Sequence, residues 1–367
     1  MVSKKTLRAV HIGLSVGHAG SLDDSRARLI VDFRRLPDVD VVAYCDWYDS
    51  SKLDEARKLF PDAGVYDNVD DLIANEDFDL ACVVLNPVDM PETLLKLANA
   101  GKHFLADKQF ALHGDDLKPV VEAVNRNNLT TFLAYPWRYH PAMQDIRQLT
   151  EEGVLGRPIA IEARQITGQV GGPHGSDPTK GTSRKDVWGG GNLQYVGCHI
   201  LEGMRFLMGC EVKTVQAQIG RPLGYTEEEV EDIAVLALEY ENGAMASLVA
   251  AYLSPSGVTG AGRSLTFYGS DGWAKWPSIG GDVLEVYSAS PKWSGTPEKV
   301  IKYNLADLPS IVGKVWFYNW IEAFANDVRA GNKGDINMTD ALYVQQSIDA
   351  AYESGRTGQR VEVKYGL

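Results

Sequence analysis

The sequence predicts an α/β domain with a doubly wound parallel sheet, followed by an α+β domain with a mainly antiparallel sheet packed on one face. Three observations predict this fold class. The chain has 367 residues, about twice the length of a typical domain. Strand-like and helix-like runs alternate over its first part. After Arg157, strand-like runs follow one another with little helix between them. We therefore predict two domains, residues 1–134 and 135–367.

The first domain is predicted as short strands that alternate with amphipathic helices. An apolar run over 9–14 enters a glycine-containing turn, and apolar residues at helical spacing follow over 25–36. The next run, 39–45, is apolar and rich in β-branched residues. The alternation continues with strands expected over 80–85, 103–106 and 130–134, and helices expected over 51–60, 69–74, 91–100 and 114–127. This order is typical of a parallel sheet.

The turn after the first strand is an imperfect dinucleotide-binding fingerprint. Read as GxGxxG from Gly13, it has Ser15 and His18 at the second and third glycine positions. Ser15 is small enough to let backbone amides approach a pyrophosphate, whereas His18 would crowd the helix against the strand. Asp46 closes the second strand, where a dinucleotide fold holds the adenosine ribose hydroxyls. The turn alone is a weak signal, and the strand–helix alternation around it strengthens the interpretation.

Polar side chains follow several of the other predicted strands. Asn86-Pro87, Asp107-Lys108 and the segment 135–138 each come directly after a strand. In doubly wound sheets, ligands bind at the carboxyl ends of the strands. An ammonium group at this edge can polarise a hydroxyl or carbonyl group, and partial burial lowers its pKa toward a useful range. Lys108 is therefore a candidate catalytic residue, and the alternative is an ordinary surface lysine after a strand.

The second domain is predicted as a run of strands with little helix between them. Asn242-Gly243 lies between two of the strands and indicates a hairpin. A segment over 168–185, rich in Gly, Pro, Ser and Lys, is interpreted as a loop that faces the substrate, and the alternative is a surface excursion. Near the end, two helices are expected over 315–326 and 339–354, the second stopped at Gly355. The expected strands are 158–166, 212–219, 233–240, 244–252, 264–268 and 283–287.

A glycine segment, Trp188 to His199, is the most informative stretch of the second domain. Three consecutive glycines, 189–191, leave bare backbone that can approach a ligand closely. Tyr195 and His199 follow four residues apart, so a helix here would place both side chains on one face. The apolar residues after them would anchor that helix on the core. The alternative is a glycine loop before an ordinary helix, with His199 as a core residue.

Composition and charge restrict the class of partner. The formal net charge is −13, from 36 basic and 49 acidic residues, and the sequence pI is near 5.0. This balance argues against binding nucleic acid or an anionic membrane, and favours a small-molecule partner. The four cysteines show no CxxC spacing and the seven histidines no HExxH cluster, so we expect neither a disulfide nor a metal site. The N-terminus lacks a signal-peptide core, and no run of about 18 apolar residues occurs, which predicts a cytoplasmic protein.

Several motifs in order give the chain a resemblance to the Gfo/Idh/MocA family of nicotinamide-dependent sugar and polyol oxidoreductases. The family phrase AGKHxxxEKP corresponds to residues 100–109, and GGGxxxDxGxH corresponds to residues 189–199. The family's "VED…NGA" pattern is present at 230–232 and 242–244. The first strand and its glycine turn match residues 10–17, and the acidic ribose-binding residue matches Asp46. The resemblance covers nearly the whole chain.

The resemblance implies a Rossmann domain, an open-faced sheet domain, and dimers or tetramers formed through that sheet. It implies NAD as the cofactor, because Trp47-Tyr48 after Asp46 offers no arginine for a 2′-phosphate. Lys52 lies near enough to leave NADP open as an alternative. Lys108 and His199 correspond to the family's proton-transfer residues. We expect NAD contacts at Gly13, Ser15, Val16, Gly17, Asp46, Trp47, Asn86, Pro87, Asp107 and Lys108, and substrate contacts at Tyr135, Arg138, Arg184, Trp188, Tyr195 and His199.

The chain departs from the family motifs at three places. Tyr195 replaces the aspartate of DxGxH, which removes a negative neighbour that would keep Lys108 and His199 protonated. The phenol of Tyr195 is itself a hydroxyl donor and could join the proton relay. Gln109 replaces a proline that could form a cis peptide bond, so we expect the loop that carries Lys108 to follow another path. The third departure is Ser15 in the glycine turn.

Three functional hypotheses follow from these motifs. The first is an NAD-dependent dehydrogenase that moves a hydride between nicotinamide and a secondary alcohol or ketone of a sugar, cyclitol or glycoside. The second is NAD-assisted glycoside cleavage by transient oxidation and elimination, with no net change in free NADH. The third is an NAD-binding paralogue that has lost catalysis. Retention of both Lys108 and His199 favours an enzyme over the third hypothesis.

Overall fold

The computed structural model describes residues 6–16, 22, 33–176, 184–227, 229–255, 262–305 and 315–367, without the side chains of 315–319. The chain divides into two compact units. The first contains the described residues up to Pro136 and those of 315–342. The second contains the described residues of 137–305 and 343–366. The predicted domain ranges, 1–134 and 135–367, stay a prediction.

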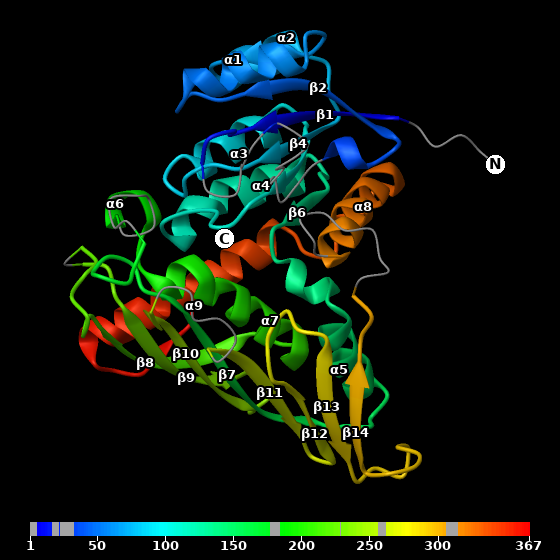
Figure 1. Cartoon of the computed structure of the whole chain (residues 1–367), viewed down its shortest axis with the longest axis vertical. Coiled ribbons are helices and arrows are strands. Elements are labelled where there is room, and N and C mark those ends of the chain that lie inside the picture. Colours follow the sequence, from blue (N-terminus) through cyan, green and yellow to red (C-terminus); the bar gives the residue numbers. More distant parts are fainter. Residues whose placement is uncertain are drawn as a thin grey trace. The chain divides into compact units, whose positions relative to one another are not determined.

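The first unit is built on a parallel sheet of six strands in the order β3-β2-β1-β4-β5-β6, drawn in blue to green in Figure 1. The chain order reverses between β1 and β4, which is the point of such sheets where a ligand binds. β1 and β4 are almost wholly buried, as strands covered on both faces must be. The strands are β1 (Leu7–Ile12), β2 (Val39–Cys45), β3 (Gly64–Tyr66), β4 (Leu80–Val83), β5 (His103–Ala106) and β6 (Thr131–Leu133).

The helices of this unit begin where the sequence supplies a cap. Asp49 accepts a hydrogen bond from the Ser51 backbone, and Asn68 accepts one from the Asp71 backbone, each at the start of a helix. Two further helices carry a proline in their first turn, where the missing N–H is not needed. The helices are η1 (Phe33–Arg35), α1 (Ser50–Leu59), α2 (Val69–Asn75), α3 (Met90–Asn99), η2 (Gly114–Leu117), α4 (Lys118–Arg126) and α8 (Val315–Ala330). Helix α9 (Met338–Thr357) begins in this unit and ends in the other.

The second unit is built on a nine-stranded sheet in the order β14-β13-β12-β11-β7-β10-β9-β8-β15. Its neighbouring strands are antiparallel except for β7 and β10. The hairpin predicted at Asn242-Gly243 joins β9 to β10, and Gly243 has a φ of +82°. The strands are β7 (Pro158–Gly168), β8 (Val212–Gly220), β9 (Ile233–Tyr240), β10 (Met245–Ser254), β11 (Arg263–Gly269), β12 (Gly272–Trp276), β13 (Val283–Ser288), β14 (Glu298–Lys302) and β15 (Val361–Glu362).

One face of this sheet, called here the inner face, is covered by helices. Along β7 and β9, buried residues alternate with exposed ones, which is the pattern of a sheet packed on one side. Helix α7 (Cys198–Met208) contacts β7, and the single π turn before it, η4 (Leu193–Gly197), contacts β10. Figure 1 shows α7 in green over these strands. The unit also contains η3 (Pro136–Tyr139), whose Pro136 falls to the first unit, α5 (Pro141–Glu151) and α6 (Lys185–Trp188).

The predicted fold class is confirmed, and several elements differ from prediction. Strands β3, β12, β14 and β15 and helix α5 were not predicted. Helix α9 was predicted to stop at Gly355 but continues to Thr357. A Cβ atom at Gly355 would lie 2.9 Å from Ile219 side-chain atoms of β8, so this glycine permits close helix–strand packing. Of the helix expected over 25–36, residues 25–32 lie outside the described residues, as do Gly17 and His18.

Candidate active site

The turn after β1 requires glycine at its first position. Gly13 has a φ of +85°, in the left-handed region that side chains disfavour. A Cβ atom at Gly13 would lie 1.8 Å from the carbonyl oxygen of Val84. The Gly13 N–H donates to the carbonyl oxygen of Cys45 at 2.8 Å, which joins the turn to the end of β2. Backbone without a side chain therefore lies at the carboxyl ends of β1, β2 and β4.

Asp46 fixes the shape of this turn. Its Oδ2 accepts hydrogen bonds from the backbone N–H groups of Leu14 at 2.5 Å and Ser15 at 3.0 Å, and from Ser15 Oγ at 2.7 Å. Its Oδ1 accepts from the backbone of Tyr48 at 2.7 Å and Asp49 at 3.0 Å. The Asp46 side chain has no exposed surface. Both oxygens are engaged by the protein, so in this structure the carboxylate orders the turn, and its role toward a ribose stays a prediction.

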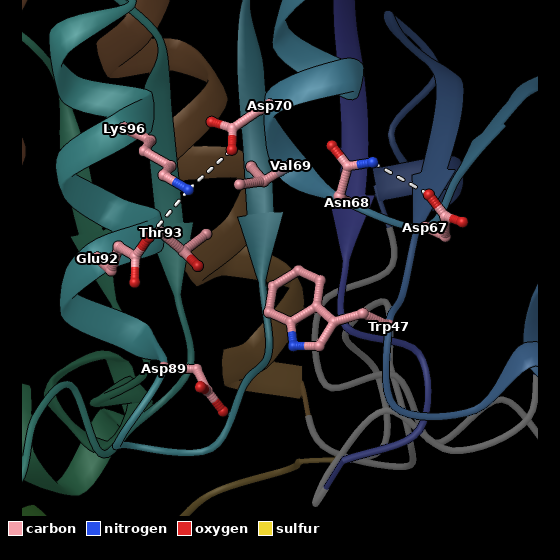
Figure 2. A pocket seen from close by; sticks show the side chains of 9 residues that line it. All are labelled: Trp47, Asp67, Asn68, Val69, Asp70, Asp89, Glu92, Thr93 and Lys96. Carbon is pink, nitrogen blue, oxygen red and sulfur yellow. Dashed lines mark hydrogen bonds and ion pairs between the residues drawn. The ribbon is translucent and has the colours of Figure 1, made fainter.

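A pocket of about 220 Å³ lies beside Trp47 in the first unit, and Figure 2 shows it from close by. Four carboxylates line it, and Lys96 is its one basic residue. The Lys96 ammonium bonds to Asp70 and Glu92, each at 2.9 Å, and these contacts raise the pKa of Lys96. The pocket is therefore acidic beside a flat aromatic ring. Its lining residues are Trp47, Asp67, Asn68, Val69, Asp70, Asp89, Glu92, Thr93 and Lys96.

A tyrosine links the ends of β2 and β4. The Tyr48 hydroxyl donates to Oδ2 of Asp89 at 2.5 Å, and it accepts from the backbone N–H of Asn86 at 3.4 Å. Burial and the neighbouring Asp89 carboxylate raise the pKa of Tyr48 well above its ordinary value. Asn86 is half-buried and Pro87 is buried. Asn86, which was predicted together with Pro87 to contact NAD, is thus held at the sheet's ligand edge.

Lys108 lies at the end of β5 and is only 4% exposed. Asp107, also 4% exposed, accepts a hydrogen bond from the Lys108 backbone N–H at 2.9 Å. The Lys108–Gln109 peptide bond is cis, so the expectation that the change from proline to Gln109 would remove this isomer and send the loop along another path is wrong for this bond. Tyr135, in the same unit, is buried with its ring edge-on to Phe110 at 5.5 Å. The interpretation of Lys108 as an ordinary surface lysine does not fit this burial.

In the second unit, Glu231 holds the glycine segment. Its carboxylate accepts hydrogen bonds from the backbone N–H groups of Gly191 at 2.7 Å and Leu193 at 3.0 Å. The Tyr352 hydroxyl of α9 donates to the same carboxylate at 3.1 Å. A Cβ atom at Gly190 would lie 2.0 Å from the Tyr352 hydroxyl oxygen, so the segment has no room for a side chain there. Burial raises the pKa of Glu231, against the effect of the two backbone donors.

Tyr195 and His199 each lie against a tryptophan. The predicted helix is present, although its first turn is the π turn η4, a feature frequent at functional sites. The Tyr195 ring meets the edge of Trp188 at 5.3 Å, and the His199 ring stacks on Trp137 at 5.0 Å. Both Tyr195 and His199 are half-buried. The sequence predicted these residues as a titratable pair but not their aromatic neighbours.

Two arginines predicted to contact substrate have protein partners in this structure. Arg138 is 8% exposed, and its Nε donates to Oε1 of the fully buried Glu202 at 2.5 Å. The Arg138 guanidinium also lies over the ring of Phe206 at 5.1 Å. Arg184 is exposed and bonds to Asp186 through two nitrogens, at 3.2 and 2.5 Å. Their predicted roles toward a substrate stay predictions.

The sequence pattern missed the structural role of Glu231. The triplet Val230-Glu231-Asp232 marked the family resemblance, but nothing in it indicated that the glutamate binds the backbone of residues 191 and 193. An acidic residue just before a predicted hairpin strand is a signal that could have suggested this role, because the start of a helix after glycines offers N–H groups without partners within the helix.

A parallel sheet with a required glycine turn at its switch point defines the class of dinucleotide-binding α/β proteins. Comparison with known families is more specific. Residues 16–135 match the oxidoreductase family with an NAD-binding Rossmann fold, and residues 143–275 match the Gfo/Idh/MocA C-terminal domain. Together the two matches span more than half of the chain. The chain belongs to the Gfo/Idh/MocA family of oxidoreductases, and its first unit is an NAD-binding Rossmann domain.

Relatives of known activity are distant. The chain is 27% identical to levoglucosan dehydrogenase from Pseudarthrobacter phenanthrenivorans, over 32% of this chain and 30% of that protein. The aligned part thus spans under a third of that relative. This chain is 23% identical to D-apiose dehydrogenase from Paraburkholderia graminis, over 90% of this chain and 85% of that protein. Both are similar to this chain in sequence, and their substrates are properties of those proteins.

The fold is shared with solved structures. A levoglucosan dehydrogenase in complex with NADH superposes with a TM-score of 0.82 at 20% identity, over 98% of this chain and all of that chain. At this identity the likeness concerns the fold alone. No helix in the part of the chain that the structure describes is long and apolar enough to cross a membrane.

Proposed function

We propose that this protein is an NAD-dependent dehydrogenase that acts on a secondary alcohol or ketone of a sugar, cyclitol or glycoside. The observation that carries the proposal is Lys108, a lysine 4% exposed at the carboxyl end of β5 in an NAD-binding sheet. Burying an ammonium group costs desolvation energy, so few lysines are buried, and this one lies at the edge where such sheets bind ligands. The retained His199 supplies a second proton-transfer group.

The residues of the first unit fit NAD. Gly13 leaves the turn without a side chain where a pyrophosphate would approach, and the Trp47 pocket offers an aromatic wall for a flat ring. The pocket carries four carboxylates, and both contacts of its lysine are to two of them. A 2′-phosphate would be repelled by this charge, so the pocket favours NAD over NADP.

The chain's own residues would manage the proton. Bound NAD supplies or accepts the hydride. Lys108 would donate to and accept from the reacting hydroxyl, and His199 would pass the proton onward. Tyr195, standing where relatives have an aspartate, would be a neutral hydroxyl in that relay. The stacking of Trp137 on His199 would keep the imidazole in one orientation.

The test is a screen for NADH formation with NAD and then NADP, against sugars, cyclitols and glycosides. We expect turnover with NAD that Lys108→Ala abolishes. Lys118→Ala is the matched control, because Lys118 only pairs with Asp115 on the surface at 3.0 Å. Thermal stabilisation by NAD without turnover on any substrate would contradict the dehydrogenase proposal.

Two other outcomes of the screen have their own meaning. Product formed from a glycoside with no change in free NADH would favour cleavage through transient oxidation. Stabilisation by NAD with no product of any kind would favour a non-catalytic NAD-binding protein. Loss of both stabilisation and turnover would contradict all three hypotheses together.

We also propose that the protein forms a homodimer or homotetramer through the face of the second unit's sheet opposite the inner face. The supporting observation is that apolar side chains lie exposed there, Val235 at 41% and Met245 at 62%. Val235 pairs across strands with Val249, which is half-buried. Light scattering after size exclusion tests this. We expect a dimer or tetramer that Val235→Lys converts to a smaller species, and a monomeric wild type would contradict it.

A further inference from the structure

One row of side chains crosses the inner face of the second unit's sheet near its polar end. Gln165 of β7 pairs with Arg263 of β11 on one side and with Ala250 of β10 on the other. Ala250 in turn pairs with Ala234 of β9. Side chains that are paired in this way point to the same face of a sheet. The row therefore places a guanidinium and an amide beside two small alanines.

The neighbouring rows of the same face are apolar. Leu265 of β11, Ala163 of β7 and Leu248 of β10 form the next row. All three are buried. The row that contains Gln165 and Arg263 is therefore polar, whereas the next row of the same face is apolar.

Gln165 is buried without hydrogen bonds. Its side chain has no exposed surface, and in the described part of the chain neither Nε2 nor Oε1 has a hydrogen-bond partner. Buried amides in folded proteins are nearly always paired. An amide that is unpaired at both atoms, on the face covered by the helix that carries His199, can donate to and accept from a ligand.

Arg263 is a half-buried cation beside this amide. Burial lowers the pKa of its guanidinium, and no carboxylate counters that effect. Its guanidinium forms no ion pair or hydrogen bond with any residue that the structure describes. The neighbouring segment 256–261 contains only Ser, Gly, Val, Thr and Ala, so its sequence supplies no acid. A partly desolvated arginine without a counter-ion is suited to an anionic ligand.

The glycine segment brings a third polar group to this end of the face. Asn192 has no exposed surface, and its Nδ2 donates to Oγ1 of Thr167 at 2.7 Å. Thr167 lies two residues after Gln165 on β7. Among the described residues, Oδ1 of Asn192 has no hydrogen-bond partner. A ligand hydroxyl could donate to this oxygen.

The same row lies under the start of the helix that carries His199. A Cβ atom at Gly197, the last residue of η4, would lie 3.2 Å from Cβ of Ala250. Ala250 is the direct neighbour of Gln165. Gly197 precedes His199 by two residues. The unpaired groups thus lie one strand away from the start of helix α7, the helix that carries His199.

We propose that Arg263 and Gln165 bind the carboxylate of a sugar acid, an aldonic or uronic acid, and that Asn192 accepts a hydrogen bond from one of its hydroxyls. This inference rests on the proposed function and narrows its substrate class. A carboxylate accepts two parallel hydrogen bonds from the planar guanidinium and a third from the Gln165 amide nitrogen. A neutral sugar would leave the arginine desolvated and without a counter-ion.

The test is binding measured by titration calorimetry on the whole chain, with and without NAD. The probes are gluconate and glucuronate, each beside its neutral counterpart, glucitol and glucose. We expect the acids to bind roughly tenfold more tightly or better than the neutral compounds. Arg263→Met should remove this preference, whereas Arg263→Lys should keep part of it. Arg57→Met is the matched control, because Arg57 is an exposed arginine of α1 that pairs with Asp54 on the surface of the first unit.

Binding can be measured without turnover. The carboxylate site and the dehydrogenase activity can therefore be contradicted independently of each other. Acid binding that Arg263→Met weakens would uphold the carboxylate site even if the dehydrogenase screen is silent. Equal binding of acids and neutral sugars, binding of neither, or acid binding unchanged in Arg263→Met would overturn it. If Arg263→Met does not fold by near-ultraviolet circular dichroism, Gln165→Leu is the second variant. It keeps the volume, fills the unpaired site with an apolar group, and should lower acid affinity while raising stability.

Discussion

Arg138 and Glu202 form a buried ion pair, with 2.5 Å between Nε of the arginine and Oε1 of the glutamate. Because Glu202 has no exposed surface, removing its partner would leave an uncompensated charge inside the second unit. We expect Arg138→Met to lower the free energy of unfolding by about 3–5 kcal/mol, measured in urea. The double variant with Glu202→Leu should recover most of the loss. A stable Arg138→Met protein with a raised KM would instead support the predicted substrate contact.

Gly191 is a position where the backbone leaves no room for a side chain. A Cβ atom there would lie 2.1 Å from the carbonyl oxygen of Glu231, which is backbone and cannot turn aside. We expect Gly191→Ala to destabilise the protein by about 1–3 kcal/mol, by thermal unfolding. Gly168→Ala is the control, because a Cβ atom at Gly168 meets nothing within 4 Å. Equal melting temperatures of the two variants would contradict the required glycine.

Glu231 gives stability a dependence on pH. Burial raises the pKa of its carboxyl above the ordinary value of 4.5, so the folded state binds the proton more tightly than the unfolded state. Its contribution is fully present below pH 4.5 and is lost as the pH rises through the folded-state pKa. Glu231→Gln cannot ionise, so its stability relative to wild type should rise with pH over this window. Urea unfolding at several pH values measures the difference, and parallel pH profiles would refute the assignment.

The structural role of Asp46 and its predicted role in binding the ribose can be separated by experiment. Asp46→Asn would keep one acceptor oxygen and turn an amide N–H₂ toward backbone donors, so we expect a loss of about 2–3 kcal/mol in stability. Asp49→Asn is the control, because Asp49 only caps α1 and asparagine caps a helix as well. Chemical unfolding and thermal stabilisation by NAD are the two readouts. Weaker NAD binding at unchanged stability would show that Asp46 acts on the ribose and not on the turn.

The parallel sheet was predictable because its strands are continuous apolar runs between capped helices. The limits of β2, 39–45, and of β5, 103–106, agree with the sequence pattern because both strands are mainly apolar and bounded by polar residues. β14 was missed because Glu298–Lys302 alternates exposed residues with half-buried ones and has no fully buried face. Helix α5 was missed although its signals were present, a proline in the first turn and His140 as its cap.

Site residues were predictable where they directly follow a strand or a glycine run in the sequence. They were not predictable where two residues meet only through the register of paired strands. Lys108 and His199 could be selected from their positions after a strand and after glycines. Arg263 and Gln165 are 98 residues apart in the chain and meet only because β11 pairs with β7 in one particular register. A shift of β11 by one residue against β7 would turn the Arg263 side chain to the other face, away from Gln165. Nothing local in the sequence specifies that register.

The hydrogen bond between Tyr352 and Glu231 can form only late in synthesis of the chain. The glutamate precedes its hydroxyl donor by 121 residues, and the Tyr352 hydroxyl oxygen also bounds the space above Gly190. During synthesis the glycine segment and its carboxylate therefore leave the ribosome well before the helix that completes their surroundings. Until α9 docks, the Glu231 carboxylate lacks the hydrogen bond that the Tyr352 hydroxyl donates. The glycine segment, although central in the sequence, thus reaches its final surroundings only after a helix from the end of the chain has docked.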